Sequence, residues 1–173
     1  MKKIILMVAT IATIATAQAA SVIDRATDMI CGYESFRATP YLCPGGRLTI
    51  GYGCTDPAII KKGKVTKAEA RKWVRDRVVD EEKWVVKTFG SKLTDNQKVA
   101  LISAAYNIGH SGLCWKTVKG KKVHTNFYNA VIAGNWTKAN AELQDWNKSG
   151  GKVLAGLTKR RLAEGKLLQR KVV

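Results

Sequence analysis

The chain has 173 residues, 46% of them hydrophobic, which fits a single folded domain with a buried core and excludes a disordered protein. Its 30 lysines and arginines against 13 acidic residues give a formal charge of +17. That charge predicts attraction to a polyanion, namely nucleic acid, an anionic membrane or an acidic cell envelope, without choosing among them.

The N-terminus has the features of an export segment. Basic residues 2–3 precede the apolar run 4–17, which ends in Ala17-Gln18-Ala19, a small-x-small cleavage pattern. Residues 4–23 carry no charge, so the stretch is also about long enough to cross a bilayer once. A buried N-terminal helix fits poorly because the run has no polar face. We predict export of the chain, which argues against nucleic acid as its partner.

An amphipathic helix is expected over residues 21–33, and it leads into a tight hairpin. Residues 41–43 and 48–50 read as the two strands, with Pro44-Gly45-Gly46 as the turn between them. Glu34 would then project from the helix end towards the hairpin. A glutamate at a helix end is ordinarily a solvated charge, and only the pattern that follows it indicates more.

Residues 34–55 resemble the catalytic stretch of the phage-type (T-even) lysozymes, which cleave peptidoglycan. In that family a Glu is followed after eight residues by Asp, after five more by Thr, and then by Ile-Gly-x-Gly. The residues that match position by position are Glu34, Thr49, Ile50, Gly51 and Gly53. Cys43 stands where most members carry Asp, and Tyr41-Leu42-Cys43-Pro44 is similar to a subset of exported phage lysozymes that carry Cys there.

The rest of the chain predicts a helical body without repeats or linkers. Residues 54–64 are expected to form a loop, and Thr66 and Glu69 a capping box that opens a long amphipathic helix ending near residue 88. Further expected elements are an apolar helix from a second capping box at 94–97 to about 109, a basic loop at 110–124, short helices at 127–133 and 137–145, a turn at 147–151 and a closing helix at 157–170.

The resemblance continues through the Asp145-Trp146-Asn147 segment to Glu164, so it covers nearly all of the chain after the export segment. It implies that an arginine near the C-terminus, Arg160 or Arg161, pairs with Glu34. It also implies that Asn107 faces the substrate cleft, although Gly109 makes a helix C-cap an equally good interpretation of Asn107.

The implied chemistry is the cleavage of a glycosidic bond. Glu34 would be the general acid, with burial favouring its protonated form and a nearby arginine opposing it. Thr49 would bind and orient the attacking water, and Cys43 would act as a stabiliser, a base or a nucleophile. A buried or disulfide-bonded role for Cys43 is the alternative.

The four cysteines, Cys31, Cys43, Cys54 and Cys114, allow three complete disulfide pairings. No C-x-x-C motif is present and the chain has only two histidines, so we expect no metal and no cofactor. A disulfide to Cys43 would block the site until thiol exchange freed it. Relatives with a catalytic Cys take the exchanging thiol from their anchor segment, but residues 1–30 contain no cysteine.

We therefore predict an α+β, mostly helical domain with two lobes, a small β-hairpin sheet and a long inter-lobe helix at residues 21–173. Residues 1–20 would be a signal peptide or, as in some phage lysozymes, a signal-anchor-release segment that tethers the chain to the inner membrane through residues 4–23. The chain would be a monomeric endolysin acting in the periplasm or outside the cell. Its substrate would be the bond between N-acetylmuramic acid and N-acetylglucosamine in peptidoglycan, and envelope polyanions would be further partners. Alternatives are a lytic transglycosylase that uses Glu34 alone and a non-catalytic basic module that binds a polymer.

Overall fold

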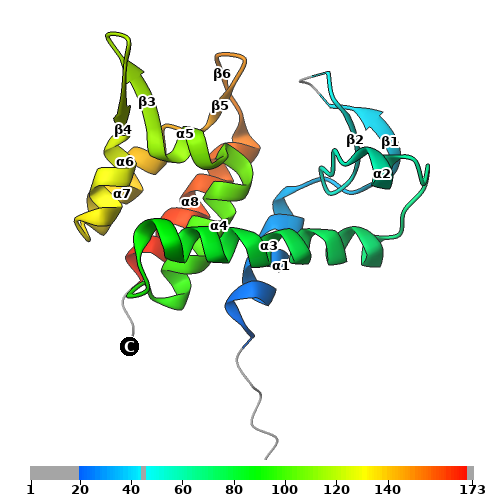
Figure 1. Cartoon of the computed structure of the whole chain (residues 1–173), viewed down its shortest axis with the longest axis horizontal. Helices are drawn as coiled ribbons and strands as arrows, with labels where there is room; N and C mark the ends of the chain where they lie inside the picture. Colours follow the sequence, from blue (N-terminus) through cyan, green and yellow to red (C-terminus); the bar gives the residue numbers. More distant parts are fainter. Residues whose placement is uncertain (1–19, 44–45, 171–173) are drawn as a thin grey trace, which may run out of the picture.

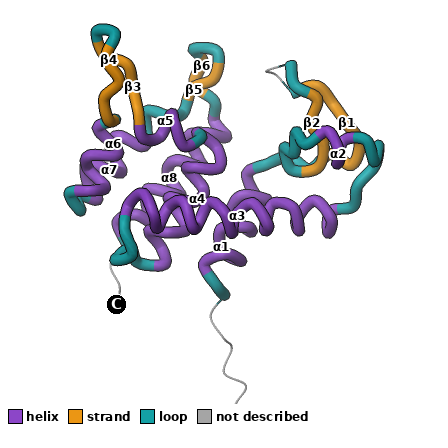
Figure 2. The backbone as a smooth tube through the Cα atoms, viewed as in Figure 1, coloured by secondary structure: helices purple, strands orange, loops and turns teal. Residues whose placement is uncertain are grey.

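The computed structural model describes residues 20–43 and 46–170, and it is mostly helical with three short antiparallel hairpins (Figure 1, Figure 2). The helices are α1 (Val22–Tyr33), α2 (Pro57–Ile60), α3 (Lys67–Phe89), α4 (Asp95–Ile108), α5 (His110–Cys114), α6 (Asn126–Ile132), α7 (Trp136–Leu143) and α8 (Ala155–Gln169). The strands pair as β1 (Arg37–Leu42) with β2 (Leu48–Gly51), β3 (Trp115–Val118) with β4 (Lys121–His124), and β5 (Lys148–Ser149) with β6 (Lys152–Val153). The predicted α+β, mostly helical class is confirmed.

Two apolar clusters define two lobes, and α3 runs between them (Figure 1). Near its start α3 buries Ala70 against Ile50 of the β1–β2 hairpin. Further along it buries Val78 and Val85 in the larger cluster. The predicted long inter-lobe helix is therefore confirmed, and it fixes the hairpin lobe relative to the helical lobe.

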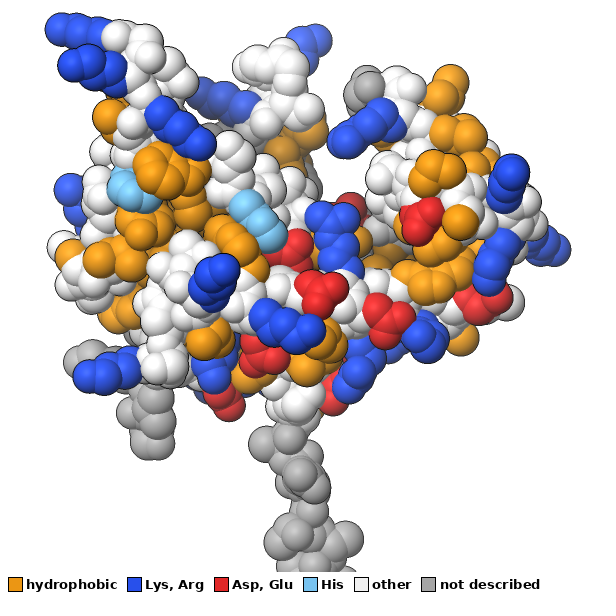
Figure 3. Space-filling model, in the orientation of Figure 1, with side chains coloured by type: hydrophobic (Ala, Val, Ile, Leu, Met, Phe, Trp, Pro, Cys, Tyr) orange, Lys and Arg blue, Asp and Glu red, His pale blue; other side chains and the backbone are white. Residues whose placement is uncertain are grey.

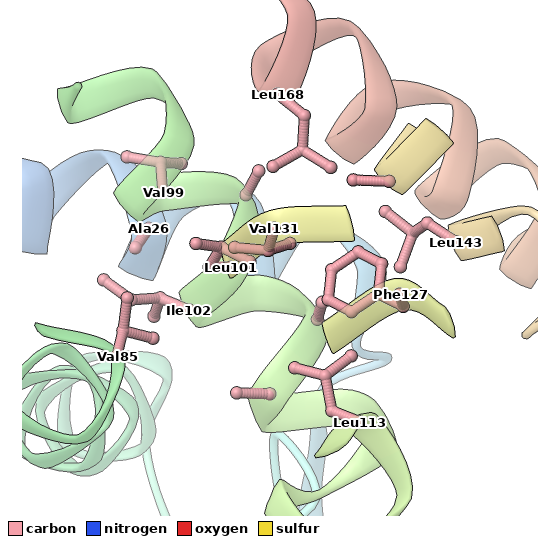
Figure 4. Close-up of a cluster of buried hydrophobic side chains, with 14 of the residues drawn as sticks. Ala26, Val85, Val99, Leu101, Ile102, Leu113, Phe127, Val131, Leu143 and Leu168 are labelled. Carbon is pink, nitrogen blue, oxygen red and sulfur yellow. The ribbon is translucent and has the colours of Figure 1, made fainter. Parts of the chain in front are cut away.

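Helix α4 is the centre of the larger lobe. Figure 4 shows Val99, Leu101 and Ile102 of α4 pointing into one cluster with Phe127 and Leu168, which come from α6 and α8. A capping box fixes the start of α4, because the Thr94 hydroxyl accepts from the Gln97 N–H and the Gln97 side chain accepts from the Thr94 N–H. α3 begins with the same arrangement at its own predicted box.

Two segments predicted as loops contain regular structure. Residues 54–64 include α2, because Pro57 occupies its first turn and the Asp56 carboxylate accepts from the Ala58 N–H. Residues 110–124 form α5 and the β3–β4 hairpin. Lys119 and Gly120 take φ values of 48° and 76°, the backbone that a two-residue hairpin turn requires.

The predicted export segment at residues 1–20 lies outside the described residues, apart from Ala20. It stays a prediction. Within residues 20–43 and 46–170, none of the helices combines the length and the apolar character needed to cross a membrane.

Gly51 is expected to be intolerant of a side chain. It has a φ of 66°, and a Cβ there would lie 2.9 Å from the Ala70 Cβ of α3. We expect Gly51→Ala to lower the free energy of unfolding by about 2–4 kcal/mol, since backbone strain and overpacking add. Gly63→Ala is the matched control, because Gly63 has a φ of 71° but no atom within 4 Å of its Cβ position. Equal losses in urea denaturation would show that the contact with α3 contributes nothing.

Candidate active site

Glu34 lies at the junction of the two lobes, directly after α1. Its N–H donates to the Ile30 carbonyl at 2.9 Å, which holds it as the cap of the helix. Its side chain is 26% exposed. The backbone of Gly53 passes beside the carboxylate, because a Cβ on Gly53 would lie 3.9 Å from Glu34 Oε2. The carboxylate is thus partly enclosed between the helix end and the segment that follows β2.

Arg160 of α8 makes the ion pair with Glu34. Its side chain is 2% exposed, and its Nη1 donates to Glu34 Oε1 at 2.7 Å. Arg161 instead donates from Nη2 to Asn107 Oδ1 at 3.0 Å. The structure therefore separates the two candidate arginines. Asn107 is an exposed residue of α4 that is held by Arg161, and the C-cap of that helix is Gly109.

Glu164, fully buried, lies behind both arginines. Its Oε1 accepts from Arg160 Nε at 3.2 Å and from the Ser103 hydroxyl at 2.6 Å, and its Oε2 lies 2.9 Å from Arg161 Nε. Burial raises the pKa of Glu164, and the two guanidinium groups oppose that shift. The Ser103 carbonyl also accepts from Arg160 Nη2 at 3.1 Å. These contacts fix Arg160 in the orientation that reaches Glu34.

Our sequence interpretation gave no role to Ser103 or Glu164. A signal for Glu164 was present, because residues three and four apart on a helix share a face and Glu164 follows Arg161 and Arg160 at those spacings. The closing helix therefore contained a recognisable ion-pair cluster. Nothing in the sequence indicates that Ser103 joins it, since that contact spans 61 residues.

Cys43 and Thr49 meet at one main-chain carbonyl of the β1–β2 hairpin. The Arg47 oxygen accepts from the Cys43 N–H at 2.9 Å and from the Thr49 hydroxyl at 3.0 Å. Thr49, 3% exposed, lies opposite Tyr41 in the strand register, and Cys43 is half-buried. Because the Thr49 hydroxyl donates its proton to Arg47, its oxygen keeps lone pairs that can accept from a water molecule.

The other three thiols form no disulfide with one another. Burial raises the pKa of Cys31 and of Cys114, which keeps both as neutral thiols at neutral pH. Within the described part of the chain, no group of three histidine, cysteine or acidic side chains is placed to hold a metal ion.

A pocket of about 400 Å³ adjoins this junction, and one hydrogen bond beside it joins the lobes. The Tyr106 hydroxyl of α4 donates to the Tyr52 carbonyl of the hairpin lobe at 3.3 Å. Burial raises the pKa of Tyr106 to about 12, so the hydroxyl keeps its proton at neutral pH. The pocket lining includes Tyr52, Thr55, Trp73, Arg77 and Tyr106.

The comparisons with known proteins agree with this geometry. A family model described as phage lysozyme matches residues 31–164, which include Glu34, the hairpin and the arginine cluster. The chain belongs to the phage lysozyme family. It is accordingly a glycoside hydrolase, so the alternative of a non-catalytic basic module is not supported.

Individual relatives extend the match over most of this lysozyme. It is 34% identical over 153 residues to the SAR-endolysin of Haemophilus phage HP1 (strain HP1c1), covering 86% of this chain and 81% of that protein. Its fold matches the active form of the P1 phage endolysin Lyz with a TM-score of 0.71 at 28% identity, covering 83% and 82% of the two chains. The match to the secreted inactive form of the same endolysin has a TM-score of 0.51 at 28% identity and covers 61% and 69%.

Proposed function

We propose that this lysozyme is an endolysin that hydrolyses the β-1,4 bond between N-acetylmuramic acid and N-acetylglucosamine in peptidoglycan, with Glu34 as the general acid. The observation that carries the proposal is the partly enclosed Glu34 carboxylate, held between α1, Gly53 and the buried Arg160. A single acid at a lobe junction suits proton donation to the oxygen of a bound glycosidic bond.

Arg160 has two functions in this mechanism. It orients the carboxyl group through the 2.7 Å contact, and it stabilises the carboxylate that remains after Glu34 has given its proton to the leaving oxygen. Because Glu164 and Ser103 hold Arg160 in place, the geometry exists before substrate binds. Asn107, fixed by Arg161, supplies an exposed amide for binding the substrate.

Thr49 and Cys43 of the hairpin act on the attacking water and on the sugar, whereas Glu34 acts on the leaving oxygen. Thr49 accepts a hydrogen bond from the attacking water, and Cys43 serves as the base or as a stabiliser of the positive charge that develops on the sugar. Their shared contact with the Arg47 carbonyl supports this pairing, since it fixes both residues at the same end of the hairpin.

The site of action follows from similarity to exported relatives. The HP1 relative carries the name SAR-endolysin, and residues 4–23 of this chain are uncharged and largely apolar. We infer export to the periplasm or beyond, with residues 4–23 as a cleaved signal or a releasable inner-membrane tether. The positive charge of the chain suits a monomer acting within a polyanionic envelope.

A lytic transglycosylase that uses Glu34 alone is the second candidate. A lytic transglycosylase needs only one catalytic carboxylic acid. The observation that favours it is that residues 37–51, the β1–β2 hairpin, contain no acidic residue that could be a second one. Purified walls digested by the enzyme distinguish the two, because hydrolysis leaves reducing ends and transglycosylation leaves anhydro-sugar ends. We expect reducing N-acetylmuramic acid ends. Anhydro-sugar ends as the main product would show that the enzyme is a lytic transglycosylase and not a hydrolase.

Cys43→Ser is expected to lower the rate of wall hydrolysis about 10²-fold, because serine is a much weaker base than a thiolate and carries no charge. Cys43→Asp is expected to retain more activity, since it restores an anion at the same place. Turbidity loss of purified walls measures both, and Cys54→Ser is the control in the same lobe. Undiminished hydrolysis by Cys43→Ser would remove Cys43 from the mechanism.

A further inference from the structure

Three hairpins project from one side of the molecule. Figure 1 shows β1–β2 rising from the smaller lobe and β3–β4 and β5–β6 rising from the larger lobe, while α3 lies along the base. We use "hairpin face" for the exposed residues of 37–51, 115–124 and 148–154 that the structure describes.

The hairpin face is purely basic. None of the 13 acidic residues of the chain falls within its three segments. Figure 3 shows blue side chains at the outer ends of the projections and most of the red ones lower down. The exposed basic residues of the hairpin face are Arg37, Arg47, Lys116, Lys119, Lys121, Lys122, Lys148 and Lys152. Eight of the 30 lysines and arginines of the chain therefore lie on a face whose three segments contain no acidic residue.

The same face also exposes apolar side chains. Leu42 is 70% exposed, Val153 59% and Val118 45%, and further exposed members are Leu48, Trp115, Val123 and Leu154. In β3–β4 the register places Lys116 opposite Val123 and Val118 opposite Lys121, so cationic and aliphatic groups alternate across the hairpin. A concentration of exposed apolar groups on one side of a protein marks an interaction surface.

The combination of charges and apolar groups identifies the partner. A soluble polyanion is bound by cations and gains little from exposed leucine and valine. The surface of an anionic bilayer attracts lysine and arginine to its phosphates and accepts apolar side chains just beneath them. We propose that the hairpin face binds the surface of an anionic phospholipid bilayer. This contact depends neither on the N-terminal segment nor on hydrolysis.

Vesicle sedimentation of the full chain tests this proposal. An uncharged segment such as residues 4–23 would add similar binding to charged and to neutral vesicles. The measured quantity is therefore the ratio of binding to vesicles of phosphatidylcholine with phosphatidylglycerol over binding to vesicles of phosphatidylcholine alone. Lys121→Gln/Lys152→Gln removes one charge from each of two hairpins, and we expect that ratio to fall about tenfold. The matched control, Lys87→Gln/Lys138→Gln, changes exposed lysines of α3 and α7 outside the hairpin face and should leave the ratio near the wild-type value.

A second pair of variants separates a bilayer from a soluble polymer. Val118→Ser/Val153→Ser is expected to lower binding to the anionic vesicles severalfold while leaving binding to inorganic polyphosphate unchanged. If the binding ratio falls equally in the two double-lysine variants, the proposal is overturned, because the net charge of the protein and not the hairpin face then determines binding. Vesicle binding that is insensitive to the valine changes would overturn it in favour of a soluble polyanion. Circular dichroism of each variant checks that the fold is retained.

Discussion

Glu34→Gln is expected to lower the rate of peptidoglycan hydrolysis about 10³-fold while leaving the fold intact. The amide has nearly the shape of the carboxyl group, and its oxygen can still accept from Arg160, which donates at 2.7 Å in the wild type. It cannot deliver a proton to the leaving sugar oxygen, and proton transfer by a positioned acid typically contributes 10²–10⁴-fold. The measurement is turbidity loss of purified walls at matched enzyme concentration.

The control for Glu34→Gln is Glu142→Gln, the same chemical change on α7. It should retain wild-type activity, and both variants should unfold within a few degrees of the wild type. If Glu34→Gln keeps more than a tenth of the activity, another group donates the proton. Binding of the inactive variant to walls would separate loss of chemistry from loss of substrate affinity.

Much of the fold could be predicted from the sequence because its signals are local. The capping boxes at Thr66 and Thr94 give the starts of α3 and α4 within one residue. The predicted strand at 48–50 lies within β2, whereas the one at 41–43 overlaps only the last two residues of β1, which begins at Arg37 and ends at Leu42. The hairpin itself is predictable because a Pro-Gly-Gly turn signal separates two short segments of alternating side chains. In both cases the residues that decide the structure lie within a few positions of one another.

The β3–β4 hairpin was missed because its turn depends on an unusual backbone at a lysine. Lys119 has a φ of 48°, and among the described residues it is the only non-glycine with a positive φ. Residues other than glycine and asparagine rarely adopt a positive φ, so the Lys119-Gly120 pair gives a weaker turn signal than Asn-Gly. The exposed lysines around it favoured a loop interpretation, although the two strands pair in a regular register.

The candidate site was predictable only where a motif carried it. Arg160 and Arg161 are adjacent in sequence, and successive residues of a helix point about 100° apart, so the sequence could not say which one reaches Glu34. The packing of α8 against α4 decides this, because Ser103 lies beside Arg160 and Asn107 beside Arg161. Such contacts join positions more than 50 residues apart, and no local pattern records them.

The cluster that orients Arg160 is also expected to matter for stability. Glu164→Gln should lower the free energy of unfolding by about 3–5 kcal/mol, the usual loss when one partner of a buried ion pair is removed. The side chains of Arg160 and Arg161 are 2% and 0% exposed, so both would stay buried without their shared carboxylate. Asp80→Asn is the contrasting control, because it removes a 3.1 Å ion pair at the surface. In that pair the side chain of Asp80 is 78% exposed and the side chain of Lys83 is 73% exposed. That pair should contribute less than about 1 kcal/mol.

Activity at a temperature where Glu164→Gln is still folded distinguishes support of the fold from orientation of the acid. If Glu164 only stabilises the lobe, the folded variant should hydrolyse walls at the wild-type rate. We expect a loss of about tenfold instead, because the amide offers the Arg160 guanidinium a neutral acceptor in place of the charged carboxylate, and small displacements of catalytic groups lower rates strongly. Arg160→Lys should show the same defect, since lysine cannot contact Glu34, Ser103 and Glu164 at once in the planar geometry of a guanidinium. Wild-type rates in both variants would assign the cluster to stability alone.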